Sequence, residues 1–240
     1  MTNNWKEISK QYDKDFLAEN LMGANATMIM AELAESLDIK EGMKVLDLGC
    51  GTGLTSTFLA KQYGVTVFAT DLWTSATDNW NRVKQMGLED KIIPIYAEAH
   101  ALPYPQEFFD VAVSVDAYHY FGTDETYLHG HLAPIVKKGG QIAIAIPGLT
   151  REFENGVTEE FKPFAVNGEF YTFHSNKYWN DLWTRSGAVT VHKSFDLKCH
   201  REAWNDWLSV NRIESEEDIP FIQSDKDNRL VIVGVIAEKK

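Results

Sequence analysis

Cysteine is scarce in this sequence, which holds only Cys50 and Cys199 among its 240 residues. These two cysteines do not make a disulfide framework, and they lie too far apart in the sequence to form a zinc-ligand motif. No run of residues approaches the ~20 apolar positions needed to span a bilayer. The chain opens with MTNNWK rather than with a basic stretch followed by an apolar one. We therefore expect a cytoplasmic protein with reduced thiols and no membrane partner.

Positive charge is also in short supply, because 23 Lys and Arg stand against 35 Asp and Glu, for a net charge of −12. Such a chain has no general electrostatic attraction for nucleic acid, so we expect no nucleic-acid partner. The hydrophobic content of 44% is ordinary for a globular protein. Internal repeats, low-complexity tracts and Gly/Ser linkers are absent from the sequence. We therefore expect residues 1–240 to form a single domain.

Strand-like and helix-like segments alternate through the middle of the chain, as in a parallel α/β sheet. The strand-like segments are nearly continuous in apolar character, which is typical of strands that helices cover on both faces. They span residues 44–48, 65–70, 92–96, 110–115 and 141–146. Two further strands, 188–195 and 229–238, lack a clear crossover between them, so we expect an antiparallel edge strand. The predicted fold is a doubly wound, mostly parallel seven-stranded sheet.

Helices are predicted on either side of these strands. Apolar residues at Ile29, Leu33 and Leu37 predict one amphipathic helix over 20–38. A second predicted helix starts near Thr123 or Asp124 and ends at the basic and glycine residues 137–140.

A glycine loop follows the first predicted strand, where Gly49, Gly51 and Gly53 alternate with other residues. Glycine allows a tight turn and lets a ligand approach the backbone closely. Asp71 ends the next strand, 22 residues after Gly49, a spacing that suits a carboxylate bound to ribose hydroxyls. A dinucleotide fingerprint would need a third glycine at Leu54, so the loop favours a different adenosine ligand.

The segment 47–53 (DLGCGTG) resembles the first motif of class I S-adenosylmethionine-dependent methyltransferases. Three later segments resemble further motifs of that family: 97–103 (AEAHALP), 108–113 (FFDVAV) and 132–140 (LAPIVKKGG). The resemblance covers roughly residues 40–147 and is closest to the small-molecule enzymes of ubiquinone and menaquinone biosynthesis. It implies a Rossmann-like fold, S-adenosylmethionine as cofactor, S-adenosylhomocysteine as product, and a small-molecule methyl acceptor.

The same resemblance implies a division of labour along the chain. Residues 1–40 would form an N-terminal helical cap, 41–147 the cofactor-binding half, and 148–240 the substrate-side half and lid. The implied cofactor-binding residues are Asp47, Gly49, Cys50, Gly51, Gly53, Asp71, Leu72, Glu98, Ala99 and Tyr12. Asp116 follows the strand-like segment 110–115 and would either line the methionine end of the donor or cap the next helix. Trp73 would either cover the adenosine or belong to the core.

Methyl transfer from a sulfonium is an in-line displacement, so the protein mainly aligns the reactants and excludes water. A base is needed only where the acceptor loses a proton. His119 is the candidate base, because histidine titrates near neutral pH, and Tyr118 is a candidate for orienting the substrate. Packing roles remain open for both. We predict no metal site, because His174, His192 and His200 are scattered without a ligand spacing.

Aromatic residues crowd the segment 151–183 and recur at Trp204 and Trp207. They would form either an acceptor pocket or the packed core of a lid. An alternative function is the binding or non-methyl use of a related ligand, as a sensor or with a carboxyl-modified or decarboxylated donor. A nicotinamide dehydrogenase and a nucleic-acid methyltransferase are less favoured. The sequence is compatible with a monomer or a homodimer.

Overall fold

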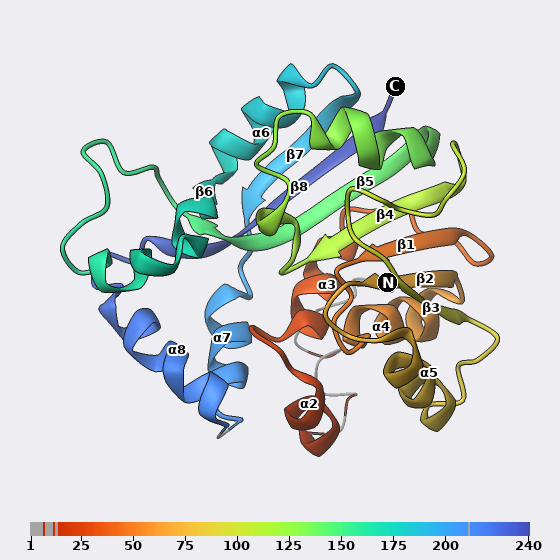
Figure 1. The fold of residues 1–240 in the computed structure, drawn as a ribbon, viewed down its shortest axis with the longest axis horizontal. Coiled ribbons are helices and arrows are strands. Elements are labelled where there is room, and N and C mark those ends of the chain that lie inside the picture. Colours follow the sequence, from red (N-terminus) through yellow and green to blue (C-terminus); the bar gives the residue numbers. More distant parts are fainter. Residues whose placement is uncertain (1–6, 8–11, 13, 211) are drawn as a thin grey trace.

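The computed structural model describes residues 7, 12, 14–210 and 212–240, and it forms an α/β sandwich around one twisted sheet (Figure 1). The strands follow in the spatial order β3-β2-β1-β4-β5-β8-β7, and a short β6 pairs with β5. Their bounds are β1 Lys44–Leu48, β2 Thr66–Asp71, β3 Ile92–Tyr96, β4 Phe109–Val115, β5 Val136–Leu149, β6 His174–Ser175, β7 Val189–Asp196 and β8 Leu230–Lys239.

The pairing confirms the predicted fold class. Strands β3, β2, β1, β4 and β5 pair in parallel, whereas β8 runs antiparallel both to β5 and to the edge strand β7. The order reverses at β1, from which β2 and β4 diverge in opposite directions along the sheet. Ligands of doubly wound sheets bind at the carboxyl ends of the strands at such a switch point.

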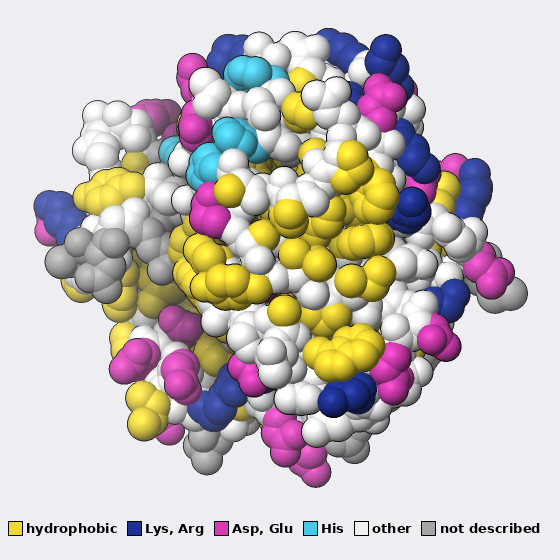
Figure 2. All heavy atoms as spheres, turned by 45° about the vertical axis from the view of Figure 1, so that its right-hand side comes forward, with side chains coloured by type: hydrophobic (Ala, Val, Ile, Leu, Met, Phe, Trp, Pro, Cys, Tyr) yellow, Lys and Arg dark blue, Asp and Glu magenta, His cyan; other side chains and the backbone are white. Residues whose placement is uncertain are grey.

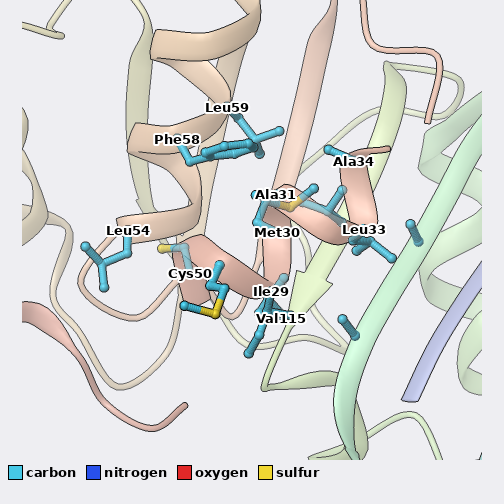
Figure 3. Packing of buried hydrophobic residues seen from close by; sticks show 14 of the residues in the cluster. Ile29, Met30, Ala31, Leu33, Ala34, Cys50, Leu54, Phe58, Leu59 and Val115 are labelled. Atoms are coloured by element: carbon cyan, nitrogen blue, oxygen red, sulfur yellow. The ribbon is translucent and has the colours of Figure 1, made fainter. Parts of the chain in front are cut away.

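Helices cover both faces of the sheet (Figure 1). One face is covered by α3 (Ala26–Ala34), α4 (Leu54–Tyr63), α5 (Ala76–Gln85) and α7 (His200–Leu208), and the other by α6 (Asn176–Arg185). Successive strand residues serve opposite faces, so Val45 joins the first core and Leu46 the second. Figure 3 shows Ile29 and Leu33 of α3 in the same core as Phe58 and Leu59 of α4.

The N-terminal helix differs from the prediction. In place of one helix over 20–38, α2 (Lys14–Asn20) ends and α3 starts only at Ala26. Asn25 is the N-cap of α3, because its side-chain oxygen accepts hydrogen bonds from Thr27 N at 3.1 Å and Met28 N at 3.2 Å. Of the predicted helical cap over 1–40, residues 1–6, 8–11 and 13 lie outside the described residues.

The predicted helix end at 137–140 is also wrong, because these residues begin β5. A π-helical turn at Leu128–Leu132 and a 3₁₀ turn at Ala133–Ile135 precede them. Pro134 lies in the first positions of the 3₁₀ turn, where no hydrogen bond within the turn needs its missing N–H. Lys137 Nζ then donates to Asp110 Oδ1 at 2.5 Å, which ties the irregular start of β5 to β4.

A third, smaller core lies beyond the end of β5 and includes residues of α8 (Ile213–Ser224). Its buried members are Leu149, Phe161, Ala165, Phe170, Phe173, Phe221 and Leu230. No described helix has both the length and the apolar character to cross a membrane.

Candidate active site

A cavity of about 320 Å³ opens at the carboxyl ends of β1, β2 and β4, on the glycine loop. Its lining includes eight of the predicted cofactor residues: Gly49, Cys50, Gly51, Asp71, Leu72, Glu98, Ala99 and Asp116. The position is the one expected for ligands of a doubly wound sheet. Figure 2 shows one face of the molecule, on which hydrophobic side chains gather across the middle and Lys and Arg lie mainly toward the margin.

The glycine loop is bent so that only small residues fit. Gly49 and Gly51 adopt φ values of +73° and +53°, which favour glycine. A methyl group added at Gly49 would overlap the side chain of Ala117, which follows β4. Gly49 N and Cys50 N donate to Thr70 O at 2.8 and 3.2 Å, so the loop is fastened to the end of β2. The loop therefore presents its backbone to the cavity.

Asp71 is held rigidly at the cavity wall. Its Oδ2 accepts from Gly51 N at 2.8 Å, and its Oδ1 accepts from Trp73 N and Thr74 N, both at 2.7 Å. Three backbone N–H groups thus fix a buried carboxylate beside the glycine loop. Such a preset charge loses little freedom when it binds a ligand hydroxyl.

Asp47 lies behind the loop rather than in the cavity. It is fully buried, and its Oδ2 accepts from Thr55 Oγ1 and, at 2.5 Å, from Ser56 Oγ. Burial raises the pKa of Asp47 to about 6, although these hydrogen bonds oppose the shift. Asp47 therefore anchors the first turn of α4, and Thr55 stands between it and a ligand.

Glu98 stands at the cavity rim after β3, paired with His100. Its Oε2 accepts from His100 N at 2.8 Å, and its Oε1 lies 2.8 Å from His100 Nδ1. The hydrogen bond with the His100 ring lowers the pKa of Glu98, which keeps the carboxylate charged. Ala99 also lines the cavity, and its carbonyl accepts from Tyr127 Oη at 3.2 Å.

Asp116 follows β4 with an unusual backbone. Its φ of +56° is uncommon for a residue other than glycine, and such strain is concentrated at functional sites. A methyl group added at Gly23 would overlap Asp116 Oδ2, so this carboxylate lies against the segment between α2 and α3. That segment closes one side of the cavity with Met22, Gly23 and Ala24.

The contribution of residues 20–26 was missed from the sequence, because one continuous helix was predicted there. The segment is fastened at both ends: Thr52 Oγ1 donates to Asn20 O at 2.5 Å, and Asn25 Nδ2 donates to Asp206 Oδ2 at 2.7 Å. Gly23 followed by a capping Asn25 was the signal that could have revealed the break. Tyr120 and Phe121, which also line the cavity, gave no such signal.

Five predicted site residues lie outside the cavity lining: Tyr12, Asp47, Gly53, Tyr118 and His119. Gly53 is the N-terminal cap of α4, and Tyr12 is buried in the first core, where burial raises its pKa to about 12. Tyr118 is fully buried in the second core, with its ring centroid 5.6 Å from that of Trp183. His119 is buried, with its ring centroid 4.1 Å from Tyr120 and 5.6 Å from Phe173.

The aromatic residues of the last third do not line this cavity. Trp179 and Trp183 belong to α6 and are buried in the second core, and Trp207 is buried with its Nε1 donating to Asp218 Oδ2 at 2.7 Å. These tryptophans are core residues, but they pack in the two cores that flank the sheet rather than in a separate lid. Within the described residues, no group of three or more His, Cys, Asp and Glu side chains is arranged to hold a metal ion.

Residues 45–140 match a family of methyltransferase domains. These residues are similar to that family. This confirms the family resemblance recognised in the sequence motifs, and the matched segment runs from β1 to the start of β5. It contains the glycine loop, Asp71, Glu98 and Asp116.

Among curated relatives, methyltransferase GfsG of Streptomyces halstedii is 31% identical over 134 residues, covering 54% of this chain and 48% of that protein. The 27-O-demethylrifamycin SV methyltransferase of Amycolatopsis mediterranei is 28% identical over 119 residues, covering 49% of this chain and 43% of its own length. The chain thus spans about half the length of these two curated relatives.

Solved structures share the fold at low sequence identity. Phosphoethanolamine N-methyltransferase 2 of Haemonchus contortus, in complex with phosphomonomethylethanolamine and S-adenosylhomocysteine, aligns with a TM-score of 0.75 at 15% identity. The alignment covers 100% of this chain and 60% of that one. The [4+2]-cyclase SpnF aligns with a TM-score of 0.73 at 12% identity, over 98% of this chain and 96% of that one. The fold is therefore compatible with more than one chemistry.

Proposed function

We propose that this protein is an S-adenosylmethionine-dependent methyltransferase that acts on a small-molecule acceptor. The observation that carries the proposal is the junction of the glycine loop and Asp71, where Gly51 N donates to Asp71 Oδ2 at the wall of the cavity. Glycine backbone and a fixed carboxylate suit an adenosine ligand that must come close and offer ribose hydroxyls. The methyltransferase domain match over 45–140 supports the same activity.

The cofactor residues predicted from the sequence have distinct roles in this proposal. Asp71 accepts hydrogen bonds from the ribose hydroxyls, and Glu98 accepts a hydrogen bond from the adenine amino group. Leu72 and the backbone of Ala99 flank the adenine ring. Asp116 accepts a hydrogen bond from the ammonium group at the methionine end of the donor. Gly49, Cys50 and Gly51 give that end room to lie against the loop, and Asp47 and Gly53 hold the loop and α4 in place.

The donor supplies an activated methyl group on a sulfonium. A lone pair of the acceptor forms the new bond to the methyl carbon as the carbon–sulfur bond breaks. Its electron pair stays on sulfur, which gives S-adenosylhomocysteine, and any acceptor proton leaves to solvent or to a base. The protein's residues align the two partners and exclude water.

We propose a positioning role for His119 in this reaction, supported by its contact with the cavity residue Tyr120. The base role expected from the sequence would require the ring of His119 to reach the acceptor. For Tyr118 we propose a structural role, because its ring is buried among Trp179, Trp183 and Tyr127.

We further propose that 1–240 works as one domain, with donor binding in 41–147, a lid in 148–240 and the rim segment 20–26 supplied by the N-terminal cap. A cytoplasmic location is supported by two buried cysteines that form no disulfide. The proposed state is a monomer or homodimer that does not use nucleic acid, in keeping with the net charge of −12.

Calorimetry tests the proposed function. S-adenosylmethionine, S-adenosylhomocysteine and NAD(H) are titrated into the wild type, Asp71→Ala and the control Asp38→Ala, whose side chain is exposed and lies outside the cavity lining. We expect micromolar binding of both sulfur ligands, at least about tenfold weaker in Asp71→Ala because charge-assisted hydrogen bonds are lost. Binding of NAD(H) instead, or equal binding by both variants, would contradict the proposal.

A further inference from the structure

Large apolar side chains are exposed at the rim of the cavity. Met22, Leu72, Trp73 and Tyr120 line it with 52%, 43%, 70% and 43% of their surface exposed, respectively. We call these four residues the apolar rim. Exposed hydrophobic residues that converge on one hollow mark a binding surface rather than ordinary surface variation.

Two aromatic residues of the apolar rim meet each other. Trp73 follows β2 and Tyr120 follows β4, yet their ring centroids are 5.1 Å apart with an interplanar angle of 61°. These loops belong to strands on opposite sides of β1. The pair therefore reaches across the cavity and offers aromatic surface to a molecule entering it.

The charges of the cavity wall all have one sign. Asp71, Glu98 and Asp116 line the cavity, and the described lining residues include no lysine or arginine. His100, also at the rim, lies 2.8 Å from Glu98, with which it shares a hydrogen bond. A phosphate or carboxylate entering this cavity beside the donor would lose its hydration and find no lysine or arginine among the described lining residues.

We propose that the methyl acceptor is an uncharged molecule with a flat apolar body, which lies against Trp73 and Tyr120. This inference rests on the proposed function, because it assigns the acceptor class of the same site. It separates this protein from the Haemonchus contortus enzyme, whose structure holds the phosphorylated compound phosphomonomethylethanolamine. Apolar surface supplies the affinity, and the absence of lysine and arginine from the described lining disfavours anions.

Two probes that share the naphthyl ring system, one uncharged and one carrying a phosphate, test the acceptor class. Protein saturated with S-adenosylhomocysteine is titrated with 2-naphthol and with 2-naphthyl phosphate, and binding is followed by calorimetry. Trp73→Ala and Tyr120→Ala remove the aromatic faces. Trp80→Ala is the matched control, since Trp80 is 39% exposed on α5 and does not line the cavity.

We expect 2-naphthol to bind the wild type and Trp80→Ala at least tenfold more tightly than 2-naphthyl phosphate. Trp73→Ala and Tyr120→Ala should each weaken 2-naphthol binding at least fivefold, and weaken S-adenosylhomocysteine binding by a smaller factor. Equal or tighter binding of the phosphate, absent binding of 2-naphthol, or an unchanged affinity in both rim variants would overturn the inference. Failure of S-adenosylhomocysteine to bind the wild type would instead contradict the proposed function.

Discussion

The cavity end of the sheet and the aromatic last third of the chain use aromatic residues in opposite ways. In the last third, Trp179, Trp183, Phe161 and Phe170 are buried against one another or against the sheet. At the cavity, Trp73 and Tyr120 remain exposed although apolar surface favours burial. In the last third the abundance of aromatic residues therefore reflects a packed core, whereas Trp73 and Tyr120 are exposed beside the cavity and mark the candidate binding surface.

The largest effect expected from this comparison is on stability. Trp179→Ala should lower the free energy of unfolding by about 3–5 kcal/mol, because it empties a large site in the second core. Trp73→Ala should change it by less than about 0.5 kcal/mol, since the side chain is exposed. Urea unfolding followed by circular dichroism measures both. Similar losses in the two variants would show that Trp73 is a core residue and would remove the contrast.

A second effect concerns pH and the buried carboxyl of Asp47. Its pKa is raised from 3.8 to about 6 on folding, so the folded state favours the protonated form. The stability that this group contributes is complete below pH 3.8 and is lost as the pH rises toward 6.

Asp47→Asn should therefore remove a pH-dependent loss of about 3 kcal/mol between pH 4 and pH 7. Urea unfolding at several pH values gives the difference between variant and wild type, in which the other titrating groups cancel. Parallel curves for the two proteins would contradict the burial of a titrating Asp47.

The glycine loop provides a smaller and more local test. Gly49→Ala should lower the free energy of unfolding by about 2–3 kcal/mol, because it adds both a strained φ and an overlap with Ala117. In Gly53→Ala the added methyl meets nothing within 4 Å, so only the strain of about 1 kcal/mol remains. Thermal unfolding of both variants measures the difference. Equal losses would mean that Ala117 does not restrict the loop.

His119 should show the smallest effect. If it positions Tyr120, His119→Gln should lower kcat/KM less than about tenfold and leave the shape of the pH profile unchanged. Loss of a limb of that profile, with a larger fall in kcat, would identify His119 as the base predicted from the sequence. The rates are measured as S-adenosylhomocysteine formed with the acceptor in excess.

The sheet was largely predictable because its strands carry their own signals. β1 and β3 have the bounds expected from their apolar runs, and β2, β7 and β8 start within one residue of the prediction. The start of β5 was missed because a basic and glycine-rich stretch is typical of a helix end. There, pairing with β4 and the contact of Lys137 with Asp110 overrode the local preference.

Backbone geometry made the glycine loop and Asp71 predictable, whereas the other predicted residues of the cavity rested on the family resemblance or on their place after a strand. The glycines and Asp71 lie together because parallel strands end at the same edge of the sheet. Nothing in the sequence showed that Thr55 and Ser56 would cover Asp47. Nor did it show that Tyr118 would enter the second core while His119 packs beside Tyr120 and Phe173. Such outcomes depend on which face of the sheet each side chain points to, and a shift of one residue in the chain reverses that direction.

The central claim is that the cavity between the glycine loop and Asp71 binds an adenosyl donor. A crystal structure of the protein with S-adenosylhomocysteine tests it most directly. The account predicts both ribose hydroxyls within hydrogen-bonding distance of the Asp71 carboxylate and the adenine amino group at Glu98. A ligand bound elsewhere, or with its ribose turned away from Asp71, would contradict it.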